Sequence, residues 1–162
     1  GGLIQGASVS GIFKTLWKTV KGLKATLITV ICLVGFSTVM DYAGMITVIA
    51  GGLAAATGSL YPLFAPLVGG IGTFITGSDT SANILFGKMQ STVAGHINVS
   101  PEWLAASNSV GATGGKIISP QSIAIATSAC SLQGKEGEIL KKSMPWAILY
   151  IVISGLMVYF LV

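Results

Sequence analysis

The sequence predicts an all-α integral membrane protein, and three observations support this fold class. Apolar residues make up 52% of the 162 residues and charged residues only 9%. Soluble domains carry about 25% charged residues, so a water-facing surface cannot be built here. The apolar residues gather in long runs, as membrane-crossing helices require. Short polar stretches interrupt two of these runs, which is typical of a transporter with a binding site at membrane depth.

The charged and cysteine residues exclude several other classes of protein. All nine basic residues are lysines, and five acidic residues oppose them, which gives a net charge of +4. Seven of the lysines precede apolar runs, at 14–24 and at 135–142, as they do in the cytoplasmic loops of membrane proteins. No basic stripe alternates with aromatic residues, so we expect no nucleic-acid partner. Cys32 and Cys130 have neither metal-type nor redox spacing, and we expect no metal and no cofactor.

The first elements are expected to be helical. Residues 13–24 predict a short amphipathic helix at the membrane interface, with lysines at helical spacing and Trp17 at headgroup depth. A cytoplasmic extension of the next span would explain the same pattern. Residues 25–41 predict the first span, which ends at Asp41. Residues 43–58 stay apolar but are short and rich in glycine and alanine, which favours an oblique or interfacial helix.

Residues 61–93 predict a re-entrant helical hairpin. Tyr61-Pro62 opens a helix that meets a polar tip, Gly77 to Asn83, before it is long enough to cross a membrane. The return arm contains Lys88 and Gln90, so lipid cannot surround it. Two arms that are too short or too polar to cross alone suit a hairpin buried in protein.

Residues 103–133 predict a single membrane span that is broken in the middle. As one helix this segment would be about 46 Å long. Pro120 cannot donate a hydrogen bond to the helix before it. Ser119 as N-cap and Pro120 at the first helical position are a normal start for a second half-helix. A charged loop, 134–142, then leads to the last span, 145–162, which carries no charge.

Residues 1–162 are expected to form one membrane domain. The chain begins Gly1-Gly2-Leu3, without methionine, and we expect it to be the interior of a longer protein. Charge bias tests the layout, because the lysine-rich loop 135–142 is cytoplasmic only if residues 42–102 make an even number of crossings. A re-entrant hairpin with a non-spanning 43–58 makes none. Two short spans would also fit.

Both polar interruptions predict a binding site for a small anion. Each starts a new helix, whose N-terminus leaves unpaired N–H groups and about half a positive charge that attract a carboxylate. The hydroxyl and amide groups that follow suit a hydroxy acid. The expected substrate-binding residues are Ser78, Thr80, Ser81, Asn83, Lys116, Ser119, Gln121 and Ser122. The alternative is that these residues only cap helices.

Asp79 and Lys116 are the ionisable groups at the interruptions, and intramembrane charges are functional candidates. An ionised Asp79 would repel a bound carboxylate, whereas a protonated one would not. We therefore expect Asp79 to carry a co-transported proton and Lys116 to face the substrate carboxylate. An Asp79–Lys116 ion pair, or Asp79 as an N-cap, is the alternative. Gly111 to Lys116 lacks residues that a phosphate-binding loop needs, and we expect no enzyme and no catalytic residue.

Two motifs resemble the C-terminal part of the bacterial L-lactate permease family. They are Gly77-Ser-Asp-Thr-Ser-Ala-Asn83 and Gly115-Lys-Ile-Ile-Ser-Pro-Gln-Ser-Ile-Ala-Ile-Ala126. Asp41-Tyr-Ala-Gly-Met45 and Gly134-Lys-Glu136 fall where that family has similar segments. The likeness runs from about Phe13 to the end of the chain, and two long motifs in the right order make it specific.

The resemblance implies a proton-coupled carrier of lactate, and often glycolate, that crosses the bacterial plasma membrane several times. The wider ion-transporter superfamily is built from two inverted repeats, each with a re-entrant hairpin and a broken helix, so this chain would be half of such a transporter and would need the missing N-terminal repeat. Hairpin tips there often carry Ser-Asn-Thr. Here Ser78-Asp79-Thr80 has an acid instead, which fits proton rather than sodium coupling. Lipid surrounds the fold, and homo-oligomerisation stays open.

Two other interpretations remain at this stage. The same fold could carry another organic anion or couple it to sodium. A membrane protein that packs helices without moving solute would explain the 22 glycines, and Gly111-x-x-x-Gly115 is a weak packing signal of this kind. That interpretation does not explain two polar interruptions with the same design.

Overall fold

The computed structural model describes Gly6 and residues 8–161, and most of these residues are helical. The elements in chain order are α1 (Val9–Tyr42), α2 (Met45–Thr57), a 3₁₀ turn (Gly58–Leu60), α3 (Tyr61–Thr76), α4 (Asp79–Ile97), α5 (Pro101–Ile118), α6 (Pro120–Ala129) and α7 (Glu136–Leu161). No β-strand occurs in this part of the chain. The predicted all-α class is confirmed for it.

The outer surface of the helices is apolar. Among the described residues, 45–76 and 136–161 are long and apolar enough to cross a membrane. Large apolar side chains point outward, including Phe36 at 57%, Ile75 at 74% and Phe160 at 78% exposure. Soluble proteins do not expose so much contiguous apolar surface, so this surface suits lipid and an integral membrane protein.

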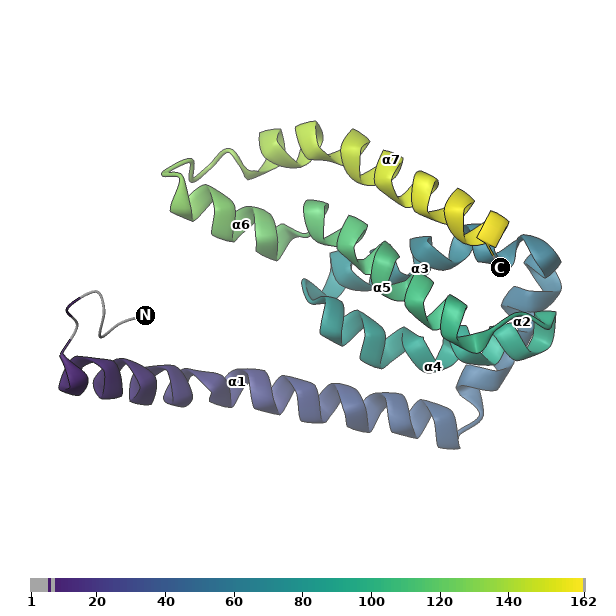
Figure 1. Ribbon diagram of the computed structural model, residues 1–162, viewed down its shortest axis with the longest axis horizontal. Helices are drawn as coiled ribbons and strands as arrows, with labels where there is room; N and C mark the ends of the chain where they lie inside the picture. The colour runs from purple at the N-terminus through teal and green to yellow at the C-terminus, as the bar shows by residue number, and fades with distance from the viewer. Residues whose placement is uncertain (1–5, 7, 162) are drawn as a thin grey trace.

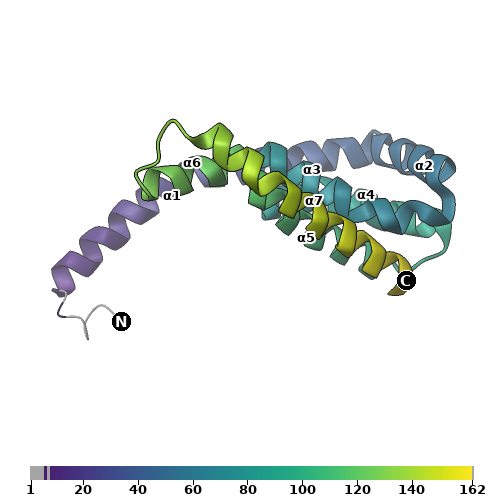
Figure 2. The ribbon, with the colours of Figure 1, turned by 90° about the horizontal axis from the view of Figure 1, so that it is seen from above.

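α1 is one continuous helix of 34 residues. The expected interfacial helix 13–24 is therefore not separate from the expected span 25–41, and the alternative of a helical extension describes the structure. The reason is local, because no proline interrupts this part of the sequence. Figures 1 and 2 show that the first half of α1 extends away from the other helices. Its position relative to a membrane surface stays a prediction.

The centre of the bundle is the crossing of α3 and α5, with α4 and α7 packed against both. Glycines let the two backbones touch. A Cβ atom on Gly111 would lie 1.7 Å from the Pro66 carbonyl oxygen, and one on Gly115 would lie 2.0 Å from the Gly70 carbonyl oxygen. The glycine pair noted in the sequence is thus a packing motif, because any side chain there would separate α3 from α5.

The hairpin of α3 and α4 reaches only part of the way along the molecule, and its tip lies beside the connection of α5 to α6 (Figure 1). The return arm, α4, continues to Ile97, beyond the expected end of the hairpin at residue 93. The first turns of α1 and the connection of α6 to α7 lie at the same end of the molecule. The two lysine-rich segments therefore share one end, as the charge-bias layout requires.

The last helix begins earlier than expected. α7 starts at Glu136, so most of the expected loop 134–142 is helical. The helix therefore begins several residues before the expected span 145–162. Glu136 and Glu138 lie in the first turn, where negative charge is stabilised by the helix dipole. Glu138 also pairs with Lys142 at 2.8 Å, one turn further on. Local charge thus extends the helix to the N-terminal side of Pro145, the first residue of the expected span.

Candidate functional site

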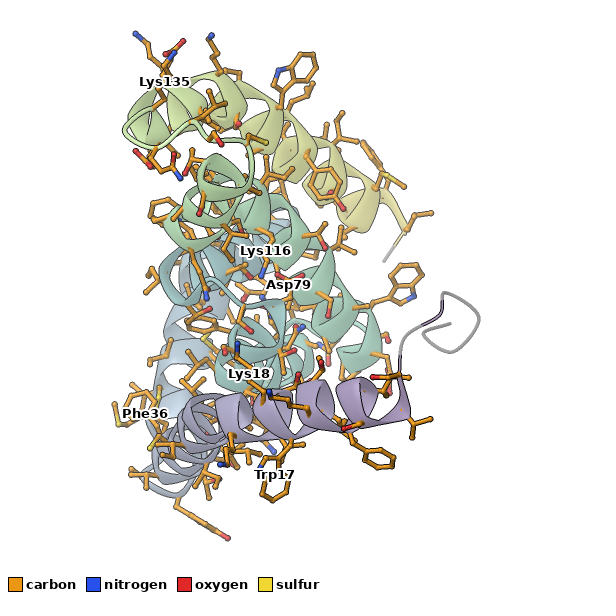
Figure 3. The ribbon with its side chains drawn as sticks, turned by 90° about the vertical axis from the view of Figure 1, so that its left-hand side faces the viewer. Trp17, Lys18, Phe36, Asp79, Lys116 and Lys135 are labelled. Atoms are coloured by element: carbon orange, nitrogen blue, oxygen red, sulfur yellow. The ribbon has the colours of Figure 1, made fainter. Side chains whose placement is uncertain are left out.

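The two polar interruptions lie against each other, although they are 39 residues apart in the chain. The Lys116 ammonium nitrogen donates a hydrogen bond of 2.6 Å to the Gly77 carbonyl oxygen. A Cβ atom on Gly77 would lie 2.0 Å from Gln121 Oε1, so the Gln121 side chain packs on the hairpin tip. Lys116 and Asp79 accordingly appear together in Figure 3. We call residues 77–83 and 116–122 the junction.

The hairpin tip is built from a glycine stop and a serine start. Gly77 ends α3 with a φ of 69°, a left-handed conformation that glycine adopts without strain. Ser78 is the N-cap of α4, and its hydroxyl oxygen accepts from the Ser81 N–H at 3.3 Å. Among the described residues, the N–H groups of Asp79 and Thr80 have no hydrogen-bond partner. They form a donor site at the start of α4.

The break between α5 and α6 follows the predicted design. α5 ends at Ile118, Ser119 is the N-cap of α6, and Pro120 occupies its first position. Ser119 is fully buried; its hydroxyl oxygen accepts from the Ser122 N–H at 3.2 Å and lies 2.9 Å from the Ser122 hydroxyl. The predicted N-cap and helix break are confirmed. The two half-helices together cover 101–129, somewhat displaced from the expected 103–133.

Asp79 and Lys116 do not pair. The ion pairs found among the described residues involve other groups, and the Lys116 ammonium is bound to the Gly77 carbonyl instead. Asp79 is not an N-cap either, because Ser78 takes that role. One carboxylate oxygen of Asp79, Oδ1, is buried without a hydrogen-bond partner. Both alternative roles considered for Asp79 are therefore wrong.

The remaining predicted residues differ in their surroundings. Thr80 and Gln121 are exposed, whereas Ser81 is buried. Asn83 turns toward α5, where its Oδ1 accepts from Asn108 Nδ2 at 2.8 Å and from the Ser109 hydroxyl at 3.0 Å. Of the eight candidate side chains, Lys116 and Gln121 contact the opposite interruption, both at Gly77. Asn83 bonds to α5 instead, and the shared role of the eight in binding stays a prediction.

A cleft of about 420 Å³ opens beside the junction, between α5, α6 and α7. Lys116 and Ser122, both predicted, line it together with Thr113 and Ser143, which the sequence interpretation missed. Thr113 stands one helical turn before Lys116, so helical spacing could have suggested it. Ser143 lies on α7, and only the fold brings it here. Isoleucines and an alanine complete the wall: Ile117, Ile123, Ala126 and Ile139.

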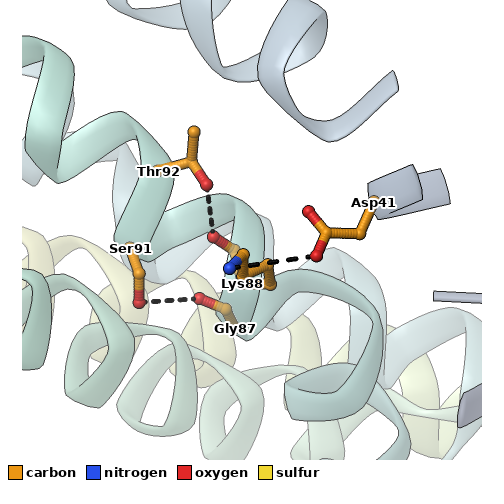
Figure 4. Close-up of polar contacts among 5 residues, drawn as sticks. All are labelled: Asp41, Gly87, Lys88, Ser91 and Thr92. Atoms are coloured by element: carbon orange, nitrogen blue, oxygen red, sulfur yellow. Dashed lines mark hydrogen bonds and ion pairs between the residues drawn. The ribbon is translucent and has the colours of Figure 1, made fainter. Parts of the chain in front are cut away.

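A second charged contact lies away from the junction. Lys88 on α4 is 3.8 Å from Asp41 near the end of α1, and the two side chains are 59% and 46% exposed (Figure 4). The neighbouring hydroxyls of Ser91 and Thr92 bond to backbone carbonyls of their own helix. The Lys88–Asp41 pair links α1 to α4 of the hairpin. Among the described residues, neither charged group contacts a polar group of the junction.

Residues 2–162 match the family model described as L-lactate permease. The chain belongs to the L-lactate permease family. It is 51% identical to an L-lactate permease of Streptococcus iniae over 65% of this chain and 22% of that protein. It is 45% identical to an L-lactate permease of Bacillus subtilis (strain 168) over 76% of this chain and 22% of that protein.

A glycolate permease of Escherichia coli (strain K12) is also similar to this permease-family chain. The two are 41% identical over 86% of this chain and 25% of that protein. The chain thus spans about a quarter of the length of the curated relatives that it matches. No solved structure matches it. The family resemblance noted from the two motifs is confirmed.

Proposed function

We propose that this chain forms the anion-binding part of a secondary carrier for L-lactate and related 2-hydroxy monocarboxylates. The observation that carries the proposal is the contact of the two interruptions, in which Lys116 Nζ lies 2.6 Å from the carbonyl oxygen of Gly77. Relatives named as lactate and glycolate permeases point to the same class of substrate. Both of those acids carry a hydroxyl group next to a carboxylate.

The junction offers complementary groups for such a molecule. Two helix N-termini bring unpaired N–H groups and partial positive charge to one place, and Lys116 adds a full positive charge. The hydroxyls of Ser122, Thr113 and Ser143 line the adjoining cleft and can bond to the 2-hydroxyl group. The isoleucines that line the cleft suit the methyl group of lactate. The cleft is almost entirely apolar beyond these groups, so a bound carboxylate would be drawn to the charged end.

In this proposal Asp79 carries the co-transported proton. Its Oδ1 atom is buried without a hydrogen-bond partner, and Asp79 is the acidic residue of the junction. An ionised carboxylate there would repel the substrate carboxylate, whereas a protonated one could donate a hydrogen bond. Proton binding would then favour anion binding, which is the coupling that symport requires.

We further propose that α3 and α4 form a re-entrant hairpin and that α5 and α6 form one broken span. The apolar segment 45–76 is long enough to cross a membrane, but the 3₁₀ turn at Gly58–Leu60 divides it into α2 and α3. α3 by itself has 16 residues and rises about 24 Å, less than the roughly 30 Å of hydrocarbon. α4 carries Lys88 and the fully buried Gln90, so protein must surround part of it. The 26 residues of α7 are long enough to cross. Alternating access would move the hairpin against α1 and α7.

A second, inverted repeat would complete the carrier in the bacterial plasma membrane. The relatives are about four times as long as the matched segment, which leaves room for such a repeat in a protein of their length. A protein that only packs helices is the competing function. The glycines at the crossing of α3 and α5 serve packing, but packing does not explain why a lysine and two capped helix starts converge.

Uptake of labelled L-lactate by vesicles tests the proposal, with the protein at its full natural length. Lys116→Gln keeps the size of the side chain but removes its charge, and we expect KM for lactate to rise about ten-fold or more. Lys18→Gln is the matched control, because Lys18 is exposed on the first half of α1, which extends away from the other helices. Wild-type uptake that Lys116→Gln leaves unchanged would mean that the junction is not the anion site. No uptake by the wild type above that of empty vesicles would leave the helix-packing function as the better account.

A further inference from the structure

A chain of polar side chains connects the start of α3 to the junction. Its members are Tyr61 on α3, Gln90 and Asn83 on α4, and Asn108 and Ser109 on α5. Gln90 and Asn108 are both 0% exposed. Fully buried amide groups are found where hydrogen bonds to protein atoms replace those to water. In this chain of side chains, each amide has one end that donates and one that accepts.

Backbone atoms determine the orientation of the Gln90 amide. Its Nε2 lies 3.0 Å from the Ala65 carbonyl oxygen, which can only accept, so the end that faces Ala65 must be the NH₂ group. The opposite end, Oε1, then accepts from the Tyr61 hydroxyl at 2.9 Å. The same Nε2 group donates to Asn108 Oδ1 at 3.2 Å. The orientation of Gln90 therefore sets that of Asn108.

Asn108 passes this orientation on to the hairpin tip. Because its Oδ1 faces Gln90, its Nδ2 faces α4, where it lies 2.8 Å from Asn83 Oδ1 and 3.5 Å from the Ala82 carbonyl oxygen. The Ser109 hydroxyl lies 3.0 Å from the same Asn83 oxygen. Asn83 Oδ1 thus accepts two hydrogen bonds, as many as its lone pairs allow. The NH₂ group is the end of Asn83 that remains for a ligand.

We propose that Gln90 and Asn108 are positioning residues that hold Asn83 with its NH₂ group toward the substrate carboxylate. The proposal rests on the proposed function of the junction. An amide that can rotate presents its oxygen to a ligand as well as its nitrogen, and an oxygen would repel a carboxylate. It would suit a metal cation instead, since hard cations bind oxygen. The buried amides thereby select an anion at this position.

Asn108→Asp tests the direction of the chain of hydrogen bonds. The substituted carboxylate still accepts from Gln90 but cannot donate to Asn83, so Asn83 must turn its NH₂ group toward α5 and its oxygen toward the substrate. We expect KM for L-lactate uptake to rise about ten-fold or more, with the maximal rate largely kept, because one charge-assisted hydrogen bond is lost. Folded protein with an unchanged KM would overturn the proposal.

Asn83→Ala keeps the test decisive if a charge at the buried position 108 prevents folding. It removes the donor itself from a half-buried position, and a similar rise in KM is expected. In a double-mutant cycle, Asn108→Asp should add no further rise to Asn83→Ala. An additive rise, or an unchanged KM in Asn83→Ala, would overturn the proposal.

Ser107→Ala is the matched control. Ser107 is as buried as its neighbour Asn108, but its hydroxyl bonds to the Leu104 carbonyl of its own helix, so KM should stay at the wild-type value.

Measurements on the wild-type protein distinguish a failure of this inference from a failure of the proposed function. If the wild type takes up lactate and both asparagine substitutions leave KM unchanged, the positioning role alone is wrong. If the wild type neither takes up nor binds L-lactate or glycolate, the proposed function is wrong and the positioning role falls with it.

Discussion

The Lys116 ammonium nitrogen lies 2.6 Å from the Gly77 carbonyl oxygen and joins the last turn of α5 to the end of α3. This carbonyl is one of the unpaired acceptors that every helix leaves at its C-terminus. The partial negative charge of that helix end favours a cation. The lysine therefore satisfies an acceptor of α3 and places a positive charge beside the first residues of α4. One contact thus aligns both interruptions.

Replacing Gly77 by alanine should destabilise the protein and lower lactate uptake. The left-handed φ of 69° costs a residue with a Cβ atom about 1–2 kcal/mol, and the new atom would also displace Gln121. Gly134→Ala is the control, because Gly134 has a φ of 86° but no atom within 4 Å of its Cβ position. Thermal unfolding in detergent compares them, and equal losses would contradict the contact with Gln121.

Replacing Gly111 by alanine should separate α3 from α5. Its Cβ atom would lie 1.7 Å from the Pro66 carbonyl oxygen, and because a backbone atom cannot move aside easily, we expect a loss of about 3 kcal/mol or no folded protein. Gly87→Ala in α4 meets nothing within 4 Å, so it should raise stability by about 0.5–1 kcal/mol through helix propensity. If unfolding midpoints show that the two variants are alike, the close crossing does not exist.

Replacing Asp79 by asparagine should abolish uptake driven by a pH gradient while lactate–lactate exchange persists. Asparagine keeps the shape of the side chain but cannot bind and release a proton. Asp41→Asn is the control, because Asp41 is about half exposed and pairs with Lys88, and an exposed pair contributes only about 0–1 kcal/mol. Uptake into vesicles with and without a pH gradient measures both. Gradient-driven uptake that survives in Asp79→Asn would assign the proton to another group.

The topology should be visible by labelling single cysteines with a membrane-impermeant maleimide. Thr15→Cys in α1 and Gln133→Cys before α7 are expected to react from the same side, because the two lysine-rich segments share one end of the molecule. Asn98→Cys, in the connection of α4 to α5, should react from the opposite side. The native Cys32 and Cys130, both exposed, are first replaced by alanine. Labelling of all three from one side would contradict the layout.

Helix ends were predictable where a local signal defines them. Ser119 followed by Pro120 has the residues of a capped helix start, and the helix breaks there. The prediction failed where two local signals compete. At the start of α7, two acidic residues and a Glu138–Lys142 pair extend the helix to the N-terminal side of Pro145. In α1, the residues change from amphipathic to apolar, which changes the environment that the helix surface favours from the membrane interface to the lipid interior. The change does not interrupt the backbone hydrogen bonds, so the helix continues.

The amino-acid sequence alone establishes that the chain is helical, that its outer surface is apolar, and that its helices are interrupted at Ser78 and Ser119. Caps, prolines and left-handed glycines act within one turn. The partners of the candidate site's side chains depend on the tertiary structure. Lys116 binds Gly77 rather than Asp79, because α3 and α5 approach until their glycines touch. Asn83 binds Asn108, because α4 packs directly on α5. Such partners come from segments that are distant in sequence, so only the packed structure brings them within reach.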